Sequence, residues 1–214
     1  IQETIPQFHN GVLRIDALEI AVREDKQNRV QATKPEIEFC QTNRGIVQIF
    51  ADAQAKGELP QRITHNDTKI DNVLLDQETD EVMCIVDLDT VMPGLIHYDF
   101  GDMVRTLTSP ADEDERDLDK VTMRMDFFNA LAKGYLSEAN DFLSEAEKGY
   151  LAQAGKVITF QLGVRFLTDH LNGDTYFRVH REGQNLDRAR VQFKLVESML
   201  ENEEAMKATI AALS

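Results

Sequence analysis

Apolar residues follow a helical spacing along most of this 214-residue chain, and only the segment from residue 61 to residue 86 departs from it. Recurrence every three or four residues predicts amphipathic helices over about residues 10–31 and residues 35–57, the second with an interruption near Gly45. The same spacing returns beyond Asp99. We therefore expect an α+β, mainly α, fold in which helices surround a small β insertion.

The segment from residue 61 to residue 86 has the pattern of short strands. Its apolar residues form three brief runs, at Ile63, Val73–Leu75 and Val82–Val86. The polar stretch Asp76–Asp80 separates the last two runs and has the composition of a turn. We therefore predict one β-hairpin preceded by a further short strand.

The second half of the chain carries helix signals. Ser144 and Glu147 have the spacing of a capping box, which predicts a helix that runs to about Leu171. A last helix is expected over about residues 186–212. The acidic stretch Ala111–Asp119 is interpreted as the exposed start of another helix, because the helix dipole favours carboxylates at that end.

The formal net charge of −15 argues against general binding to nucleic acid or to anionic membranes, since both need a basic surface. Cys40 and Cys84 lack the spacing of a zinc site or a disulfide framework, and both are expected to be buried, reduced thiols. No apolar run approaches the roughly 20 residues that span a bilayer. These features predict a cytoplasmic protein, and they do not exclude an anionic small ligand, because a bound divalent cation can reverse the local charge.

A dense group of polar residues lies between the first predicted strand and the predicted hairpin. His65, Asp67 and Asn72 have the H-x-D-x-x-x-x-N spacing of protein kinase catalytic loops, and Lys69 lies within it. Asp87 follows the second hairpin strand, where a kinase-like site needs another metal ligand. Each residue alone is common in loops, but the joint pattern between predicted strands indicates a phosphoryl-transfer site.

Phosphoryl transfer requires positioning and the neutralisation of negative charge. Mg²⁺ prefers oxygen ligands, which the amide of Asn72 and the carboxylate of Asp87 can supply. Asp67 is a candidate base that accepts the proton of the attacking hydroxyl group. Lys69 is a candidate to neutralise charge on the transferred group.

A second interpretation starts from the same strand. Asp87 and Asp89 fit the D-x-D-x-[TV] pattern of haloacid-dehalogenase-type phosphatases, in which Asp87 would attack phosphorus and Asp89 would act as acid and base. That fold needs alternating strands and helices after the motif, whereas helices alone are predicted here. A third possibility is a sugar-binding pseudokinase lobe without catalytic activity.

Three longer runs extend the pattern: THNDTKIDNVLLD from residue 64, CIVDLDTVMPGLIHYDFGDMVR from residue 84 and GVRFLTDHLNGDTYF from residue 163. Together they resemble the aminoglycoside phosphotransferase/choline kinase-like superfamily, and within it the N-acetylhexosamine 1-kinase-like group. The resemblance covers the whole chain. It implies a kinase-like lobe that uses ATP and Mg²⁺ to phosphorylate the anomeric hydroxyl of an N-acetylhexosamine.

The resemblance also implies roles for individual residues. Asp67 matches the catalytic base, and Asn72 and Asp87 match the Mg²⁺ ligands. Lys69 matches a lysine near the transferred phosphate, and Asp89 matches an acidic position close to metal and sugar. The remaining matches are Arg165 and Tyr176 in the sugar pocket, and His65 and Asp99 in structural support of the catalytic loop. From the residues alone, Arg165 in an apolar helix is better explained by a structural ion pair.

Kinases of this superfamily have a preceding β-rich lobe that covers the ATP phosphates. The sequence contains no G-x-G-x-x-G, no P-loop motif and no V-A-I-K lysine motif. We therefore expect residues 1–214 to be the C-terminal, substrate-binding and catalytic lobe, whose main partner is an N-terminal lobe of the same protein. The chain alone is expected to be weakly active or inactive.

Overall fold

The computed structural model describes residues 2–214 and confirms the mainly helical α+β fold. None of the helices in these residues combines the length and the apolar character needed to cross a bilayer. The α-helices are α1 (Gly11–Glu24), α2 (Lys34–Thr42), α3 (Gln48–Ala55), α4 (Ile96–Thr108), α5 (Met125–Ala139), α6 (Glu145–Asn172), α7 (Gln184–Glu201) and α8 (Glu203–Leu213). The short 3-10 helices are η1 (Val30–Thr33), η2 (Arg44–Val47), η3 (Ile70–Asn72), η4 (Leu88–Thr90) and η5 (Leu118–Lys120).

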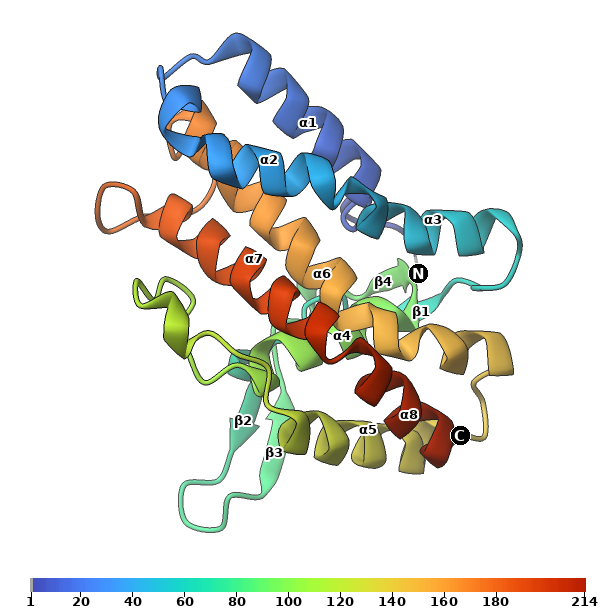
Figure 1. The fold of residues 1–214 in the computed structure, drawn as a ribbon. Coiled ribbons are helices and arrows are strands. Elements are labelled where there is room, and N and C mark those ends of the chain that lie inside the picture. Colours follow the sequence, from blue (N-terminus) through green and yellow to red (C-terminus); the bar gives the residue numbers. More distant parts are fainter. Residues whose placement is uncertain (1) are drawn as a thin grey trace.

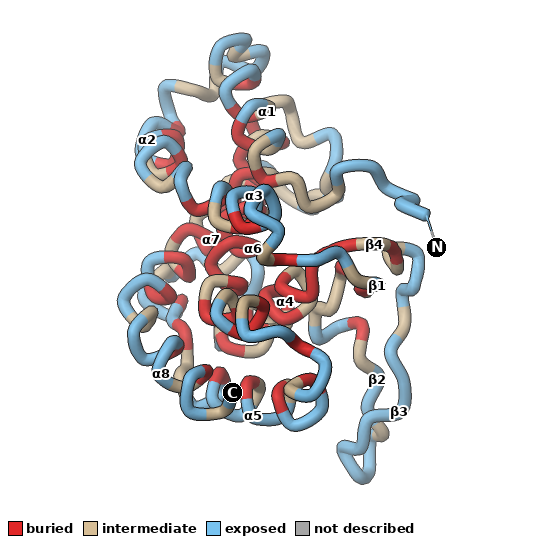
Figure 2. The backbone as a smooth tube through the Cα atoms, turned by 90° about the vertical axis from the view of Figure 1, so that its right-hand side faces the viewer, coloured by how far each residue is buried: buried red, intermediate tan, exposed pale blue. Residues whose placement is uncertain are grey.

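Helix α6 runs through the middle of the molecule and contacts α1, α4, α7 and α8 (Figure 1). The predicted capping box begins it, because the Ser144 hydroxyl accepts a hydrogen bond from the Glu147 N–H and Glu147 bonds back to the Ser144 N–H. Gly173 ends it at a φ of 100°. The buried faces of α4, α6 and α7 form the centre of the core (Figure 2).

Two small antiparallel sheets lie between α3 and α4 in the chain. The strands are β1 (Arg62–Thr64), β2 (Val73–Leu75), β3 (Val82–Ile85) and β4 (Met92–Gly94), paired as β1 with β4 and β2 with β3. Thr64 lies opposite Met92 in the first sheet, and Val73 lies opposite Ile85 in the second. The predicted hairpin is confirmed. Strand β4 was not predicted, because Met92-Pro93-Gly94 lacks the composition of a strand.

The hairpin of β2 and β3 extends away from the helices, and most of its side chains are exposed (Figures 1 and 2). Cys84 on β3 is therefore exposed, and the prediction of a second buried thiol is wrong. Cys40 on α2 is buried as predicted, and burial raises the pKa of its thiol.

Helix boundaries near residue 45 confirm the predicted interruption, but two longer helices were predicted wrongly. Helix α1 ends at Glu24 because Asp25 adopts a φ of 39° and its carboxylate accepts hydrogen bonds from the N–H groups of Arg29 and Val30. The predicted helix over residues 186–212 is divided at Asn202. The Asn202 side chain donates to the Ser198 carbonyl at 2.8 Å and competes with the helical pattern.

The acidic stretch Ala111–Asp119 does not begin an α-helix, so that prediction is also wrong. Two of its carboxylates pair instead with arginines that are distant in sequence. Asp114 contacts Arg181 at 2.9 Å, and Glu113 contacts Arg188 at 3.1 Å. These pairs hold the segment in irregular turns against the start of α7.

Candidate functional site

The loop between β1 and β2 carries the predicted catalytic residues and is held by helix α4. The carboxylate of Asp99 accepts hydrogen bonds from two consecutive backbone N–H groups, from His65 at 2.9 Å and from Asn66 at 2.6 Å. Thr68 donates to the Asp99 carbonyl at 2.6 Å. Burial raises the pKa of Asp99, although the two N–H donors act in the opposite direction.

Asn66 fixes the shape of this loop, and sequence analysis did not identify it. It is buried at a φ of 67°, a conformation that Asn tolerates better than most residues. Its side-chain amide donates to the backbone carbonyls of Thr64 and Thr90. The backbone carbonyl of Asn66 lies 3.0 Å from Nε2 of the His9 ring. Gly94 allows this packing, because a Cβ there would lie 2.5 Å from the Asn66 side chain.

His65 connects the loop to the end of the hairpin. Its Nε2 lies 3.0 Å from the Val86 carbonyl, and its Nδ1 accepts a hydrogen bond from the Asp67 N–H at 3.3 Å. The Nδ1 contact requires an unprotonated nitrogen, so Nε2 carries the hydrogen and donates to Val86. The imidazole therefore places Asp67 relative to the segment that leads to Asp87.

Asp67 lies at the centre of a group of polar side chains. Its Oδ2 contacts Lys69 Nζ at 3.1 Å and accepts a hydrogen bond from Asn72 Nδ2, also at 3.1 Å. Asn72 Nδ2 also donates to the Asp67 carbonyl at 2.7 Å. Burial disfavours the charge on Lys69, but the contact with Asp67 and the nearby carboxylates of Asp87 and Asp102 together raise the pKa of Lys69.

The two predicted metal ligands are brought to one end of the hairpin. Asn72 immediately precedes β2, and its carbonyl accepts a hydrogen bond from the Val86 N–H at 2.9 Å. Asp87 follows at a φ of 61° with an exposed side chain. Because Asn72 Nδ2 is occupied by Asp67, its oxygen is the atom left for a cation.

This donor set fits Mg²⁺, which takes one or two protein oxygen ligands and completes its shell with water and phosphate. Throughout residues 2–214 there is no group of three or more His, Cys, Asp or Glu side chains arranged to hold a metal, as a structural zinc site would need.

Asp89 is exposed in η4, and its contact with the Thr4 hydroxyl at 3.5 Å uses its backbone carbonyl.

Arg165 and Tyr176 meet even though α6 ends between them. Arg165 Nη2 lies 3.3 Å from the Tyr176 hydroxyl, and its guanidinium lies 5.5 Å from the centre of that ring. Phe8 and Phe177 are also within 6 Å of the guanidinium carbon. These residues line an open cavity of about 250 Å³, and burial lowers the pKa of Arg165.

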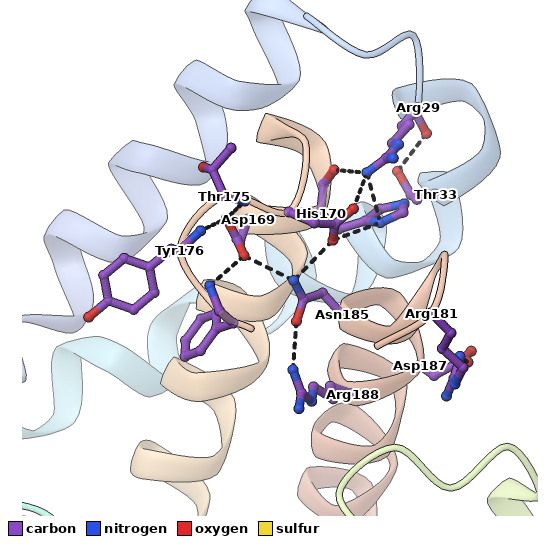
Figure 3. Close-up of polar contacts among 12 residues, drawn as sticks. Arg29, Thr33, Asp169, His170, Thr175, Tyr176, Arg181, Asn185, Asp187 and Arg188 are labelled. Carbon is purple, nitrogen blue, oxygen red and sulfur yellow. Dashed lines mark hydrogen bonds and ion pairs between the residues drawn. The ribbon is translucent and has the colours of Figure 1, made fainter. Parts of the chain in front are cut away.

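Asp169 positions the Tyr176 loop, and sequence analysis missed it as well. Its buried carboxylate accepts hydrogen bonds from the N–H groups of Thr175, Tyr176 and Phe177 at 2.9–3.0 Å, and from the Asn185 side chain at 2.9 Å (Figure 3). The run TDHLNGDTYF gives little local sign of this, because Asp169 is one of several polar residues near the end of α6.

A small cavity of about 70 Å³ brings Asp67 and Arg165 together. It lies between the catalytic loop, α4, α6 and the segment before α1. Its other lining residues are Phe8, His9, Asn66, Asp102, Arg105, Ile158, Gln161 and Leu162. Asp89 and Tyr176 do not line it, although Tyr176 lines the larger cavity, which shares Phe8 and Arg165 with the small one.

Comparison with known families supports the same region. Residues 1–138 match the Phosphotransferase enzyme family. The match covers more than half of the chain and includes the catalytic loop, the hairpin and Asp99, whereas Arg165 and Tyr176 lie beyond it. The protein therefore belongs to the Phosphotransferase enzyme family.

Proposed function

We propose that this protein is the catalytic lobe of a kinase that transfers a phosphoryl group from ATP to a hydroxyl group of a sugar. Membership of a phosphotransferase family supports the reaction class. The observation that carries the proposal is the position of Asp67, whose carboxylate is held by Lys69 and Asn72 while it lines a cavity shared with Arg165.

Asp67 would accept the proton of the attacking hydroxyl. Lys69 and Asn72 both contact its Oδ2, and no hydrogen bond from residues 2–214 reaches its Oδ1. The contacts of Oδ2 therefore fix the orientation of the carboxylate, and Oδ1 is left to take the proton of the acceptor hydroxyl. General-base catalysis of this kind contributes about 10²–10⁴-fold to a rate.

The metal and the nucleotide fit the same end of the hairpin. Asn72 and Asp87 would hold Mg²⁺ through their side-chain oxygens. When bound, Mg²⁺ neutralises charge on phosphate oxygens, and ATP donates the phosphoryl group. Lys69 is in reach of the same region and remains protonated, because the pKa of its ammonium group is raised. Asp89 is assigned by resemblance to a position near metal and sugar.

The charges around the small cavity favour a neutral acceptor. Asp67 and Asp102 contribute two carboxylates, and Arg105 and Arg165 contribute two guanidinium groups. His9 adds no charge near neutral pH, because burial lowers its pKa to about 4. A site with balanced charges suits a neutral sugar better than a polycationic aminoglycoside. The resemblance adds that the sugar is an N-acetylhexosamine attacked through its anomeric hydroxyl.

An N-terminal lobe of the same protein is part of the proposal. The hairpin that leads to Asn72 and Asp87 exposes apolar side chains on β2 and β3: Leu74, Leu75, Val82, Met83 and Ile85. Several exposed apolar side chains on one hairpin indicate a contact site. A nucleotide-clamping lobe would cover it and supply the phosphate-binding residues that this sequence lacks. We place the protein in the cytoplasm, where ATP is available.

The phosphatase interpretation of Asp87 and Asp89 is disfavoured by the fold. Both sheets formed within residues 2–214 are antiparallel, and after the motif the chain forms one short strand, β4, and then α4 to α8 rather than alternating strands and helices. A non-catalytic sugar-binding lobe remains the second candidate. The presence of Asp67, Asn72 and Asp87 together favours catalysis over it.

A substrate screen tests the proposal. The intact protein is incubated with Mg²⁺ and ATP, and ADP release is measured with N-acetylglucosamine, N-acetylgalactosamine, kanamycin, choline and homoserine. We expect release with an N-acetylhexosamine, and ³¹P NMR should show phosphate on the anomeric oxygen. Sugar binding without ADP release would favour the non-catalytic lobe. A phospho-aspartyl form of Asp87 after incubation with acetyl phosphate would favour the phosphatase.

A further inference from the structure

Two residues that line the small cavity beside Asp67 each carry a buried acceptor oxygen. Arg105 Nε donates a hydrogen bond to Asp102 Oδ1 at 2.8 Å, and Arg105 Nη2 forms an ion pair with the same oxygen at 2.8 Å. Asp102 Oδ2 and Gln161 Oε1 are buried and have no hydrogen-bond partner within residues 2–214. Asp102 is 6 % exposed and Gln161 is 3 % exposed, so bulk water does not solvate them freely.

An acceptor that is buried without a donor destabilises a protein. These two acceptors come from different helices, α4 and α6, and line the same cavity. Their convergence distinguishes them from Glu36 and Gln192, which also have a buried oxygen without a partner but do not line the cavities beside Arg165. A ligand with two hydrogen-bond donors would satisfy both cavity oxygens at once.

We propose that Asp102 and Gln161 form a specificity subsite, in which each accepts a hydrogen bond from a hydroxyl group of a polyhydroxylated acceptor bound beside Asp67. The proposal rests on the phosphotransferase function inferred above and extends it to two residues to which the resemblance assigns no role. Arg105 is a positioning residue here, because it holds Asp102 through Oδ1 and leaves Oδ2 without a partner in the protein.

The dimensions of the cavity suit one edge of a sugar. A volume of about 70 Å³ holds roughly two water molecules or hydroxyl groups, since each water takes about 30 Å³. The cavity of about 250 Å³ shares Phe8 and Arg165 with it and offers aromatic surface for the rest of the ring. The sugar would therefore direct two hydroxyls into the small cavity, to Asp102 and Gln161, while a third lies at its edge, at the partly exposed carboxylate of Asp67.

Two substitutions and two matched controls test the subsite. Asp102→Asn can keep the contact with Arg105 but replaces the charged acceptor, and Gln161→Leu removes its acceptor with little change in volume. Glu36→Gln is the control for the first, because Glu36 is buried and paired with Arg190 at 2.6 Å. Gln192→Leu is the control for the second, since Gln192 is buried on α7. Thermal melts of all four variants establish that each is folded.

Affinity for N-acetylglucosamine is measured by calorimetry on the intact protein, and KM and kcat are measured with Mg²⁺ and ATP. We expect the Kd to rise about tenfold or more for Asp102→Asn and about 2-fold to 10-fold for Gln161→Leu. Little change in kcat is expected, because neither residue receives the proton. The control variants should bind as the wild type does.

Deoxy analogues make the test specific. The 3-deoxy, 4-deoxy and 6-deoxy forms each lack one hydroxyl. For the analogue that lacks the hydroxyl bound by Asp102, wild-type affinity should fall and Asp102→Asn should cause no further loss. A different analogue should show the same relation with Gln161→Leu. Equal losses of affinity in the variants with every analogue, or unchanged affinity in both variants, would overturn the proposal. Ordered water would then be the partner of the two oxygens. If one variant does not fold, the affinities of the other variant for the sugar and its analogues decide whether the subsite exists.

The outcome separates this inference from the proposed function. If the wild type phosphorylates the sugar and Asp67→Asn abolishes the activity, but both subsite variants bind normally, only the subsite is wrong. If the wild type phosphorylates choline or homoserine and no sugar, the kinase reaction stands and the polyhydroxylated acceptor is wrong. If no acceptor is phosphorylated and no sugar binds, both proposals are wrong.

Discussion

The side chain of Asp99 holds the backbone of Asn66 in a left-handed conformation. The Asn66 N–H donates to Asp99 Oδ1 at 2.6 Å, and the backbone of Asn66 has a φ of 67°. The neighbouring N–H, from His65, donates to the other oxygen at 2.9 Å. One carboxylate on α4 thus satisfies two consecutive donors and turns the chain so that the next residue, Asp67, lines the small cavity.

Replacement of Asp99 by Asn should disturb both the loop and the activity. The amide keeps one acceptor, but its NH₂ group would face a backbone N–H, which leaves a buried donor unsatisfied. We expect a loss of about 1–3 kcal/mol in the free energy of unfolding and a lower kcat. Urea denaturation and ADP release measure the two effects. Asp126→Asn, at an exposed position of α5, is the control, and equal behaviour of the two variants would contradict the role of Asp99.

The crossing of α4 and α6 depends on Gly101. A Cβ at this position would lie 2.4 Å from the Ala154 carbonyl oxygen of α6, and the backbone would have to move. Gly101→Ala should therefore destabilise the protein by about 1–3 kcal/mol. Gly134→Ala on α5 meets no atom within 4 Å and should stabilise the protein by about 0.5–1 kcal/mol, since alanine favours helix. A stabilising effect of both substitutions in thermal melts would show that α4 and α6 can separate at no cost.

Glu147 should make stability depend on acidic pH. Hydrogen bonds from Arg62, at 2.6 and 2.9 Å, and from Ser144 lower the pKa of Glu147 from 4.5 to about 2. The folded state therefore binds the proton less readily than the unfolded chain. The stabilisation, about 3 kcal/mol, is complete above the unfolded pKa and is lost as the pH falls from 4.5 through about 2.

Glu147→Gln provides the measurement. The variant should unfold at a lower urea concentration at pH 7, and its deficit relative to the wild type should shrink as the pH falls below 4.5. A deficit that stays constant across this range would show that the Arg62 contact does not depend on the charge of Glu147.

Asp87→Asn should raise the Mg²⁺ concentration needed for activity. The substitution removes the only carboxylate of the proposed pair, and even outer-shell changes at metal sites cost about 10-fold to 100-fold in affinity. We expect at least a comparable rise in the half-saturating Mg²⁺ concentration. Asp80→Asn, in the exposed turn of the same hairpin, should leave it unchanged. An unchanged Mg²⁺ dependence in Asp87→Asn would remove Asp87 from the metal site.

Local signals in the sequence were sufficient for several elements. Ser144 and Glu147 specify the start of α6 through atoms only three residues apart, and Gly173 marks its end. The hairpin of β2 and β3 was predictable because a polar turn separates two apolar runs. Helix boundaries failed where a side chain bonds to nearby backbone, as Asp25 and Asn202 do, because the pattern of apolar residues does not register such bonds.

Relationships between distant segments were not predictable in the same way. The pairing of β1 with β4 joins residues that are about 30 positions apart, and Met92-Pro93-Gly94 gives no sign of a strand. Asp169 and Asn66 act through backbone groups that carry no sequence signature. The free oxygens of Asp102 and Gln161 depend on the crossing of α4 and α6, so only the folded chain reveals them.

The most direct test of the account is the rate of phosphorylation in Asp67→Asn. The variant keeps the shape of the side chain and can still accept hydrogen bonds from Lys69 and Asn72, but it cannot take the proton of the acceptor. With the intact protein, Mg²⁺, ATP and N-acetylglucosamine, we predict a fall in kcat of about 10²–10⁴-fold with a nearly unchanged Kd for the sugar. A kcat close to that of the wild type would contradict the assignment of Asp67 as the base, and with it the proposed mechanism.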